Sequence, residues 1–331
     1  MMADLRIGLI GLGMMGRHHA RVAREVDGVE LVGVADAMGD PHGVAGGLPV
    51  ASSVAELIEV GLDMAVVAVP TGMHEEVALQ LAEAGVHTLV EKPIASDSPA
   101  GKRIQDAFAS RGLVGAVGHI ERFNPALQSV RKRIEAGDLG EVYQIATRRQ
   151  GPFPARIADV GVVKDLGTHD IDLTAWLARS PFVSVSARTT TRSGRPHEDM
   201  VSVTGLLGND VITSHLVNWL SPMKERVTTI TGERGSFVAD TLTGDLTFFE
   251  NGTYTTQWES LAAFRGVSEG SMTRFAIEKR EPLRMEHEAF RDAVLGVSNR
   301  VVSMAEGLRT VQVAEAVLAS ARDSVVVALE S

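Results

Sequence analysis

The chain of 331 residues contains no cysteine, which excludes disulfide bonds, thiolate metal sites and thiol nucleophiles. It also has no apolar run close to the roughly 20 residues that a membrane-spanning helix needs. Its first residues, MMADLRIGLIG, lack the basic flank, long apolar core and small-residue cleavage site of a secretion signal. We therefore expect a cytoplasmic protein.

The sequence has fewer basic than acidic residues: 32 Lys and Arg compared with 42 Asp and Glu, which gives a formal net charge of -10. This balance argues against a general affinity for nucleic acid, which depends on clustered Lys and Arg. Any phosphate group should therefore be bound locally. The remaining composition, 44% hydrophobic and 22% charged, is that of a globular protein, and the length indicates two domains at roughly 150 residues each.

Apolar runs alternate with helical stretches through the first 120 residues. We expect strands over 5–11, 29–36, 63–70, 87–93 and 113–119, and helices over 14–26, 53–61, 74–85 and 98–112. This alternation predicts a parallel sheet with right-handed crossovers, and the near-continuous Val, Ile, Leu and Ala indicate strands covered on both faces. Residues 1–121 are therefore expected to form a doubly wound α/β domain.

After His119 the pattern changes to Thr- and Val-rich stretches that often alternate and are separated by Gly, Asn and Asp. Strands are expected over 141–151, 182–191, 200–208, 210–220, 226–240, 246–252 and 253–259, and helices over 167–178, 286–295 and 304–321. Residues 122–331 are therefore expected to form an α+β domain with a mostly antiparallel sheet.

Gly11, Gly13 and Gly16 have the spacing G-x-G-x-x-G, directly after a predicted strand and at the start of a predicted helix. The spacing alone is common in a chain with 33 glycines, but this context indicates a dinucleotide-binding turn. Gly11 would permit the tight turn, Gly13 would let the main chain approach a pyrophosphate, and Gly16 would let the helix pack closely. The N-terminus of the helix would then attract the phosphates.

Asp36 ends the next predicted strand, about 20 residues after Gly16, where a ribose-binding acid is expected. Its carboxylate would bind both ribose hydroxyls and repel a 2'-phosphate, and Ala37 and Met38 offer no basic side chain. We therefore expect NAD rather than NADP, although an Asp at a strand end can also be purely structural. The expected cofactor site comprises Gly11, Gly13, Met14, Met15, Gly16, Asp36, Pro70, Thr71, His74, Glu91 and Lys92.

Two further stretches carry groups suited to proton chemistry. Lys92, in VEKPIA, follows a predicted strand on the side where open α/β sheets bind ligands, although such a lysine is often only a solvated turn residue. Asp165 and His169 are four residues apart and share a helix face, with Asp172 near the same side, although a capping Asp and a satisfied His would give this pattern too. His18 and His19 are adjacent and diverge on a helix, so packing or solvent-facing roles are expected for them.

The order of these motifs, with VPTGMHEEVALQLAEAGVHTLVEKPIA, ERFNPA and DLGTHDIDLTAW, resembles the glucose-fructose oxidoreductase, inositol dehydrogenase and MocA family along essentially the whole chain. The resemblance implies an NAD-binding Rossmann domain over residues 1–121 and, over residues 122–331, an open sheet that binds substrate and mediates oligomerisation. It also implies Lys92, Asp165 and His169 as the catalytic set, a cis peptide before Pro93, and a homodimer or homotetramer. His169 would accept the hydroxyl proton, Lys92 would stabilise the alkoxide, and Asp165 would orient His169 or bind substrate. No metal is required.

GHIERFNPA and NWLSPMKERVTTITGERGSF look most like the branch of this family that oxidises the 3-hydroxyl of UDP-N-acetylglucosamine. The candidate contacts to substrate are Arg122, Asn124, Arg156, Lys164, Lys224, Asp165 and His169, with His119, Glu121 and Trp219 as further candidates for the cleft. An inositol or free-sugar dehydrogenase remains open as an alternative. So does a regulator that binds NAD and sugar without catalysis, since some members of this fold family regulate.

Overall fold

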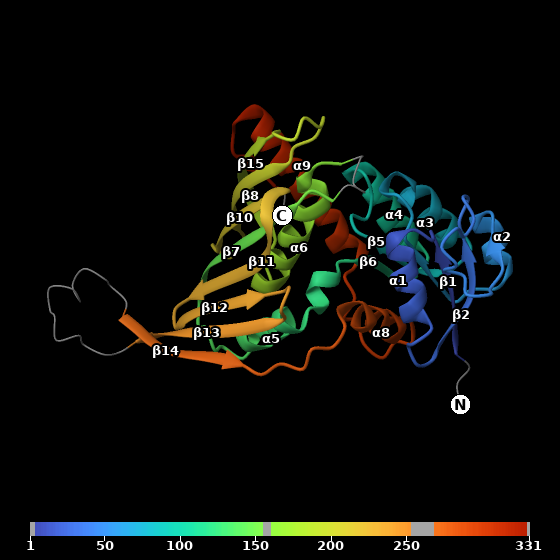
Figure 1. Ribbon diagram of the computed structural model, residues 1–331, viewed down its shortest axis with the longest axis horizontal. Coiled ribbons are helices and arrows are strands. Elements are labelled where there is room, and N and C mark those ends of the chain that lie inside the picture. The colour runs from blue at the N-terminus through green and yellow to red at the C-terminus, as the bar shows by residue number, and fades with distance from the viewer. Residues whose placement is uncertain (1–3, 155–159, 253–267, 330–331) are drawn as a thin grey trace. The chain divides into compact units, whose positions relative to one another are not determined.

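The structure is a computed structural model that describes residues 4–154, 160–252 and 268–329 (Figure 1). The chain divides into two compact units. The first comprises Met1–Phe123 and Arg280–Gln312, and the second comprises Asn124–Lys279 and Val313–Ser331. Each unit therefore contains a long N-terminal part and a short segment that the chain adds near its end.

The first unit contains a six-stranded sheet in which every neighbouring pair is parallel. The strands are β1 (Leu5–Ile10), β2 (Val29–Ala35), β3 (Val50–Ala51), β4 (Met64–Val67), β5 (His87–Glu91) and β6 (Gly115–Gly118). Their order, β3-β2-β1-β4-β5-β6, confirms the expected doubly wound topology. Only the two-residue strand β3 was not predicted, because two residues are too short to show a periodic pattern.

Helices cover this sheet as its pattern of apolar residues indicates. They are α1 (Met14–Ala23), α2 (Val54–Glu59), α3 (His74–Glu83) and α4 (Ser98–Ser110), with short 3-10 turns at Thr71–Met73 and Ile120–Phe123. Ser53 and Asp97 begin α2 and α4 by accepting hydrogen bonds from the backbone N–H groups of Glu56 and Ala100. The alternation of strand and helix thus predicted the elements of residues 5–118 apart from β3 and the short 3-10 turn.

The end of the chain differs from the expected domain division, which assigned everything after residue 121 to the second domain. Helix α8 (Pro282–Val294) and the part of α9 (Met304–Asp323) up to Gln312 belong to the first unit. Phe290 of α8 is fully buried in the core formed by β1 and its neighbours, and Leu283 packs with Val22 and Val26. The amphipathic pattern of α8 shows that one face is buried but does not identify the sheet that it covers.

The second unit contains a nine-stranded sheet in which β7 and β10 form the parallel pair and the other described pairs are antiparallel. The strands are β7 (Val142–Pro152), β8 (Phe182–Thr190), β9 (Met200–Leu207), β10 (Ile212–Asn218), β11 (Leu220–Gly232), β12 (Gly235–Asp240), β13 (Asp245–Gly252), β14 (Ser268–Phe275) and β15 (Val327–Ala328). Their order is β14-β13-β12-β11-β7-β10-β9-β8-β15, which confirms the open, mostly antiparallel sheet.

Helices α5 (Pro125–Glu135), α6 (Thr168–Ala178) and the end of α9 supply apolar side chains to the core of this second unit. Leu127, Leu173 and Val317 pack there with alternate residues of the strands, such as Ile145 and Val203. Helix α5 and strands β14 and β15 were not predicted, and the strand expected over 253–259 lies outside the described residues.

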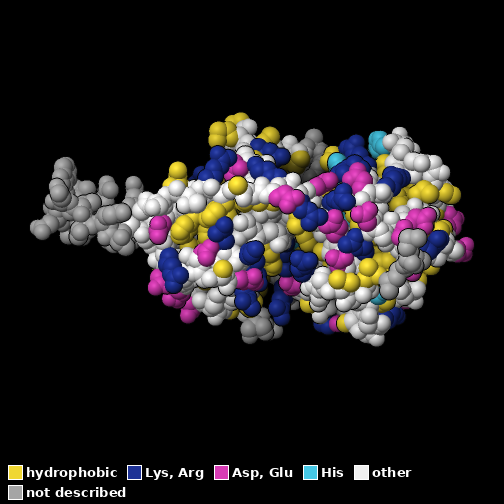
Figure 2. All heavy atoms as spheres, turned by 90° about the horizontal axis from the view of Figure 1, so that it is seen from below, with side chains coloured by type: hydrophobic (Ala, Val, Ile, Leu, Met, Phe, Trp, Pro, Cys, Tyr) yellow, Lys and Arg dark blue, Asp and Glu magenta, His cyan; other side chains and the backbone are white. Residues whose placement is uncertain are grey.

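Among the described helices, none combines the length and apolar character needed to cross a lipid bilayer. On the face that Figure 2 shows, Lys and Arg side chains are interspersed with Asp and Glu. The charges on this face are therefore mixed in sign, as the modest net excess of acidic residues suggests.

Candidate active site

The glycine turn between β1 and α1 has the close backbone contacts that its motif predicts. Gly11 has φ of +94°, and a Cβ there would lie 2.6 Å from the carbonyl oxygen of Ala68. A Cβ on Gly16 would lie 1.9 Å from the carbonyl oxygen of Gly11. Both glycines are therefore required by the packing of the protein itself.

Gly13 is different, because nothing among the described residues lies within 4 Å of the place where its Cβ would stand. Its φ of -71° suits any residue, so the backbone does not explain the glycine either. Gly13 is also the N-cap of α1, which has no side-chain cap and no acidic residue in its first turn. The turn thus leaves room and unshared N–H groups for an anionic ligand, and it fits the pyrophosphate of a dinucleotide.

Asp36 follows β2 and uses both carboxylate oxygens to fix the neighbouring backbone. Oδ2 accepts a hydrogen bond from the N–H of Leu12 and Oδ1 accepts one from the N–H of Met38, each at 2.8 Å. Since each oxygen of a carboxylate can accept more than one hydrogen bond, Asp36 can hold the glycine turn and also bind ribose hydroxyls. The structural and the ribose-binding interpretations are therefore compatible.

The remaining predicted cofactor residues follow strands of the same parallel sheet or begin its helices. Met14 and Met15 form the first turn of α1, and Pro70 and Thr71 follow β4, with Pro70 exposed. His74 is instead only 1% exposed, and its ring nitrogens lie 2.9 Å from the carbonyl oxygen of Pro93 and 3.0 Å from that of Val69. Burial lowers the pKa of His74, which favours its neutral form. His74 thus supports the backbone at Val69 and Pro93.

Lys92 directly follows β5, at the carboxyl edge of the sheet where α/β proteins bind their ligands. It is half-buried, its peptide bond to Pro93 is cis as the resemblance implies, and its N–H donates to Glu91 Oε2 at 3.0 Å. The glycine turn after β1 and the lysine after β5 therefore lie at the same edge of one sheet.

Glu91 is part of a buried cluster that the sequence analysis did not find. Its Oε1 lies 2.8 Å from Nε2 of His19, and Nδ1 of His19 lies 2.8 Å from Nε2 of His287 on α8. His19 is 1% exposed and His287 is 2% exposed. The packing role expected for His19 was therefore incomplete, because its partner His287 is 268 residues away in the sequence and no local pattern connects them.

Glu286, beside His287 on α8, completes this buried cluster. It is 2% exposed, and neither of its carboxylate oxygens has a hydrogen-bond partner among the described residues. Burial, and to a lesser degree the negative charge of Glu91, raises the pKa of Glu286 well above its ordinary range. The buried site of Glu286 thus favours its protonated form.

The second unit holds the other predicted catalytic residues at the start of α6. A π-helical turn, Val163–Gly167, contains Asp165 and leads into α6, which contains His169 and Asp172. Asp165 and Asp172 are buried and His169 is half-buried. Single π-helical turns are frequent at functional sites, although the sequence predicted an ordinary helix here.

Two contacts fix this segment to its surroundings within the second unit. Glu198 Oε1 accepts a hydrogen bond from the N–H of Val163 at 3.1 Å. Arg149 on β7 donates from Nε to Asp170 Oδ1 at 2.8 Å, and both side chains are at most 5% exposed. A buried ion pair of this kind is expensive to break because one charge would remain unpaired, so the turn after Asp165 is firmly placed.

Several predicted substrate residues have structural contacts. Arg122 is 7% exposed and donates to Glu306 Oε1 at 2.7 Å. Asn124 caps α5 through the N–H of Ala126 and also donates to the carbonyl oxygen of Thr241. Trp219 is buried against Phe153, in an edge-to-face contact at 5.3 Å between ring centres.

For the other predicted substrate residues, the structure gives position and burial. Lys164 is half-buried in the π-helical turn, Lys224 is exposed on β11, and Glu121 lies in the 3-10 turn after β6. His119 is buried, at 1% exposure. Arg156 lies outside the described residues. Their contacts to substrate therefore stay predictions.

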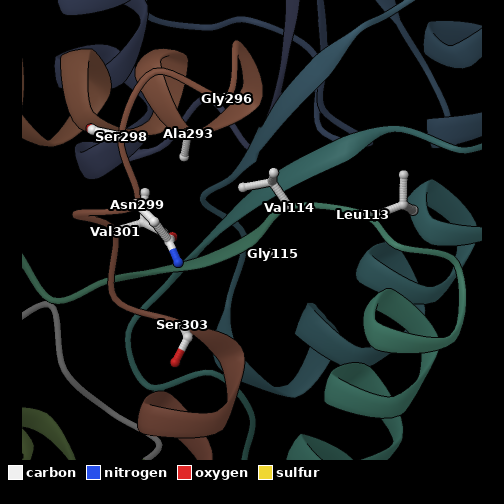
Figure 3. Close-up of a pocket in the computed structure, with 9 residues that line it drawn as sticks. All are labelled: Leu113, Val114, Gly115, Ala293, Gly296, Ser298, Asn299, Val301 and Ser303. Atoms are coloured by element: carbon white, nitrogen blue, oxygen red, sulfur yellow. The ribbon is translucent and has the colours of Figure 1, made fainter.

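A pocket of about 430 Å³ in the first unit lies away from the carboxyl edge of the sheet. Leu113, Val114 and Gly115, at the start of β6, form one side of it, and the loop from α8 to α9 forms the other (Figure 3). The pocket is therefore at the amino edge of β6, opposite the edge that carries the glycine turn and Lys92.

Comparison with known families agrees with this description. Residues 5–119 match the model described as "Oxidoreductase family, NAD-binding Rossmann fold", and residues 127–238 match the GFO/IDH/MocA C-terminal domain. The chain belongs to the Gfo/Idh/MocA family. The resemblance drawn from its motifs is thereby confirmed.

Relatives within the Gfo/Idh/MocA family act on different compounds according to their names. Inositol 2-dehydrogenase 2 of Saccharopolyspora erythraea is 34% identical over 59% of this chain and 60% of its own length. UDP-N-acetylglucosamine 3-dehydrogenase of Acidithiobacillus ferrooxidans is 35% identical over 56% of this chain and 58% of its own length. The chain thus spans about three-fifths of the length of these curated relatives.

Solved structures in the family match the chain more completely. The Acidithiobacillus ferrooxidans enzyme superposes with a TM-score of 0.82 at 27% identity, over 97% of this chain and 99% of its own. The WlbA dehydrogenase from Bordetella pertussis, in complex with NADH and UDP-GlcNAcA, has a TM-score of 0.80 at 26% identity, over 99% of both chains.

Alanine substitutions at Gly13 and Gly16 should separate cofactor binding from folding. G13A adds a methyl group that meets no protein atom but occupies the approach to the pyrophosphate, so NADH affinity should fall at least about tenfold while thermal unfolding stays near wild type. G16A should lower stability by about 1–3 kcal/mol or more, because its methyl group meets the Gly11 carbonyl. NADH fluorescence titration and calorimetry measure the two effects. Wild-type NADH affinity in G13A would contradict this interpretation of the turn.

Replacing Glu286 by Gln should change how stability depends on pH. Above pH 4.5 the folded wild type keeps the Glu286 proton that the unfolded chain releases, so its stability falls as pH rises toward the raised pKa. E286Q lacks this loss, and its free energy of unfolding relative to wild type should increase with pH by at most about 1.4 kcal/mol per unit. Denaturant unfolding from pH 5 to 8 measures it, with the partly exposed Glu288→Gln as control. A flat difference would show that Glu286 is ionised.

Proposed function

We propose that the protein is an NAD-dependent dehydrogenase that oxidises a secondary alcohol of a sugar or polyol. The observation that carries this proposal is the presence of an open dinucleotide turn at Gly13 and a supported lysine, Lys92, at the same edge of one parallel sheet. Membership of an NAD-binding oxidoreductase family supports the cofactor class.

The residues of the first unit would hold the cofactor through the α1 N-terminus, Gly13 and Asp36. NAD supplies the hydride acceptor when it is bound. Lys92 would place a positive charge where the substrate oxygen becomes negative, and His169 would accept the hydroxyl proton, since imidazole has a pKa near neutrality. Asp165 would orient His169 or bind substrate hydroxyls, with Asp172 behind it.

For the substrate, we propose the 3-hydroxyl of a UDP-linked N-acetylhexosamine. The two solved relatives named above, which match nearly the whole chain, support it. The inositol 2-dehydrogenases support the alternative of an inositol or free sugar to the same degree. Formation of NADH, followed at 340 nm with a panel of UDP-sugars, free sugars and inositols, decides between them. No turnover with any member, together with NADH binding, would favour a non-catalytic regulator.

Two further properties belong to the same proposal. We expect NAD to be preferred over NADP, because Asp36 would repel a 2'-phosphate and Met38, which is 88% exposed, cannot neutralise it. We also expect a homodimer or homotetramer formed through the open sheet of the second unit, as the family resemblance implies.

Replacing either Lys92 or His169 by Ala should lower kcat by a factor of about 10²–10⁴, because each substitution removes a group that acts on the reacting hydroxyl. Steady-state kinetics with the best substrate of the panel measures this loss. Lys102→Ala is the matched control, since Lys102 is exposed on α4 and pairs with Asp106. Near-normal turnover in K92A or H169A would refute the assigned role.

Replacing Asp36 by Asn should weaken the preference of the protein for NAD over NADP. D36N can still accept the hydrogen bond from Leu12 but has lost the charge that repels a 2'-phosphate. The ratio of kcat/KM for NAD over NADP should therefore fall at least about tenfold, which corresponds to roughly 1.4 kcal/mol. Equal ratios in D36N and wild type would show that the preference does not come from Asp36.

A further inference from the structure

A chain of buried polar side chains runs from helix α8 to the backbone of Lys92, entirely within the first unit. His287 contacts His19, His19 contacts Glu91 Oε1, and Glu91 Oε2 accepts the N–H of Lys92. The three distances are 2.8, 2.8 and 3.0 Å. His19, on α1, is therefore the central member of this chain.

The charges in this cluster favour an ionised Glu91. Burial alone would raise its pKa, but the hydrogen bond from His19, the charges of His19 and Lys92, and the backbone N–H of Lys92 together lower it. Burial lowers the pKa of His287 well below its ordinary range and raises the pKa of Glu286 well above its own. The surroundings thus favour the ionised form of Glu91 and the protonated form of Glu286, and Glu91 accepts hydrogen bonds on both of its oxygens.

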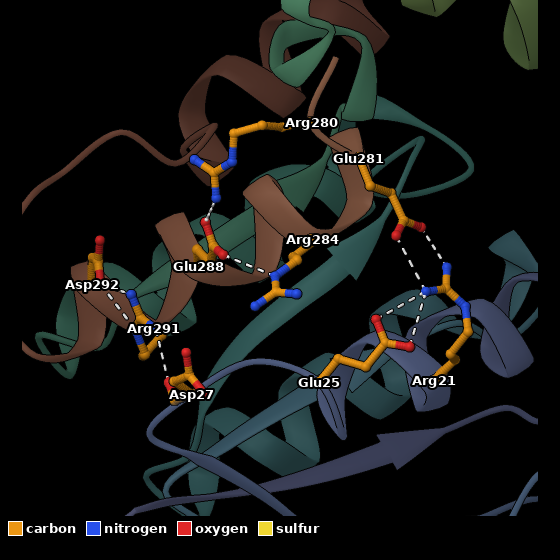
Figure 4. A network of polar contacts seen from close by, with 9 residues as sticks. All are labelled: Arg21, Glu25, Asp27, Arg280, Glu281, Arg284, Glu288, Arg291 and Asp292. Atoms are coloured by element: carbon orange, nitrogen blue, oxygen red, sulfur yellow. Dashed lines mark hydrogen bonds and ion pairs between the residues drawn. The ribbon is translucent and has the colours of Figure 1, made fainter. Parts of the chain in front are cut away.

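Helix α8 is held against α1 by more than this buried chain. Figure 4 shows Arg21 of α1 bonded to Glu281 at the start of α8 and to Glu25 in the turn that follows α1. Near the other end of α8, Arg291 donates to the carbonyl oxygen of Asp27 at 2.7 Å. Both ends of α8 are therefore attached to the segment that carries His19, which fixes His287 relative to His19.

We propose that His19 is a positioning residue for Lys92, acting through Glu91, and that His287 fixes the orientation of the His19 ring. This inference rests on the proposed function, because it gives Lys92 a role in catalysis. Without the hydrogen bond from His19, the Glu91 carboxylate is free to turn away from the Lys92 backbone. A displacement of about 1 Å of a catalytic group can lower a rate about 100-fold.

Two amide substitutions at His19 separate its two hydrogen bonds. The amide of Gln reaches the place of Nε2 and can still donate to Glu91, whereas the shorter amide of Asn reaches the place of Nδ1 and contacts only His287. H19N should lower kcat by about 10- to 100-fold, while H19Q should stay within about fivefold of wild type. NADH affinity should change less than about threefold in both, because the glycine turn is untouched. His18→Asn, on the exposed neighbour, is the control.

A measurement without cofactor tests the same inference independently of turnover. In the cofactor-free protein, the rate at which acetic anhydride modifies Lys92, followed by mass spectrometry, should change at least about threefold in H19N and less than twofold in H19Q. Lys102 serves as the internal reference. If no substrate is oxidised, the proposed function fails, and this labelling still decides the role of His19.

Equal kcat and equal Lys92 labelling in H19N and H19Q would overturn the inference. So would a loss in H19N that persists in full when Lys92 is also replaced by Ala, because His19 would then act by another route. A lower unfolding temperature in H19N without any change in kcat or labelling would make His19 a purely structural residue.

Discussion

The close contact between Gly16 and the carbonyl oxygen of Gly11 governs the arrangement of the first unit. Because no side chain separates them, α1 begins directly above the carboxyl end of β1, with its N-terminus uncapped. His19, less than one turn farther along, then reaches Glu91 at the end of β5. One glycine thus determines both the opening for an anion and the support of the lysine segment.

The second unit reaches a comparable rigidity by different means. Its π-helical turn and the first residues of α6 are fixed by a buried ion pair from β7 and a carboxylate from the loop before β9. Lys92 and His169 are half-buried, whereas Asp165 is buried, and buried polar or charged residues such as Glu91 and Asp170 are next to them in the chain. The buried groups supply precision, and the half-buried ones remain accessible to a ligand.

Features encoded by neighbouring residues could be predicted from the sequence, whereas those that depend on distant partners could not. The strands and helices of residues 5–118 follow from hydrophobic periodicity, and the roles of Gly11 and Gly16 follow from their spacing. The return of α8 to the first unit left no local trace, because its apolar stripe fits either sheet. For the same reason His19 was taken as a packing residue, and Glu286 and His287 were not singled out. The π-helical turn at Asp165 was also missed, since its residues read as ordinary helix.

The discontinuity of the first unit has a consequence for biosynthesis. When the ribosome has translated residues 1–123, the parallel sheet can already form, but Phe290, His287 and the arginines and glutamates of α8 do not yet exist. His19 then lacks the contact to His287 that it makes in the complete chain. The segment around Lys92 acquires its support only after residues Asn124–Lys279 of the second unit have been synthesised, so the nucleotide-binding half is completed by a helix that is made after most of the other unit.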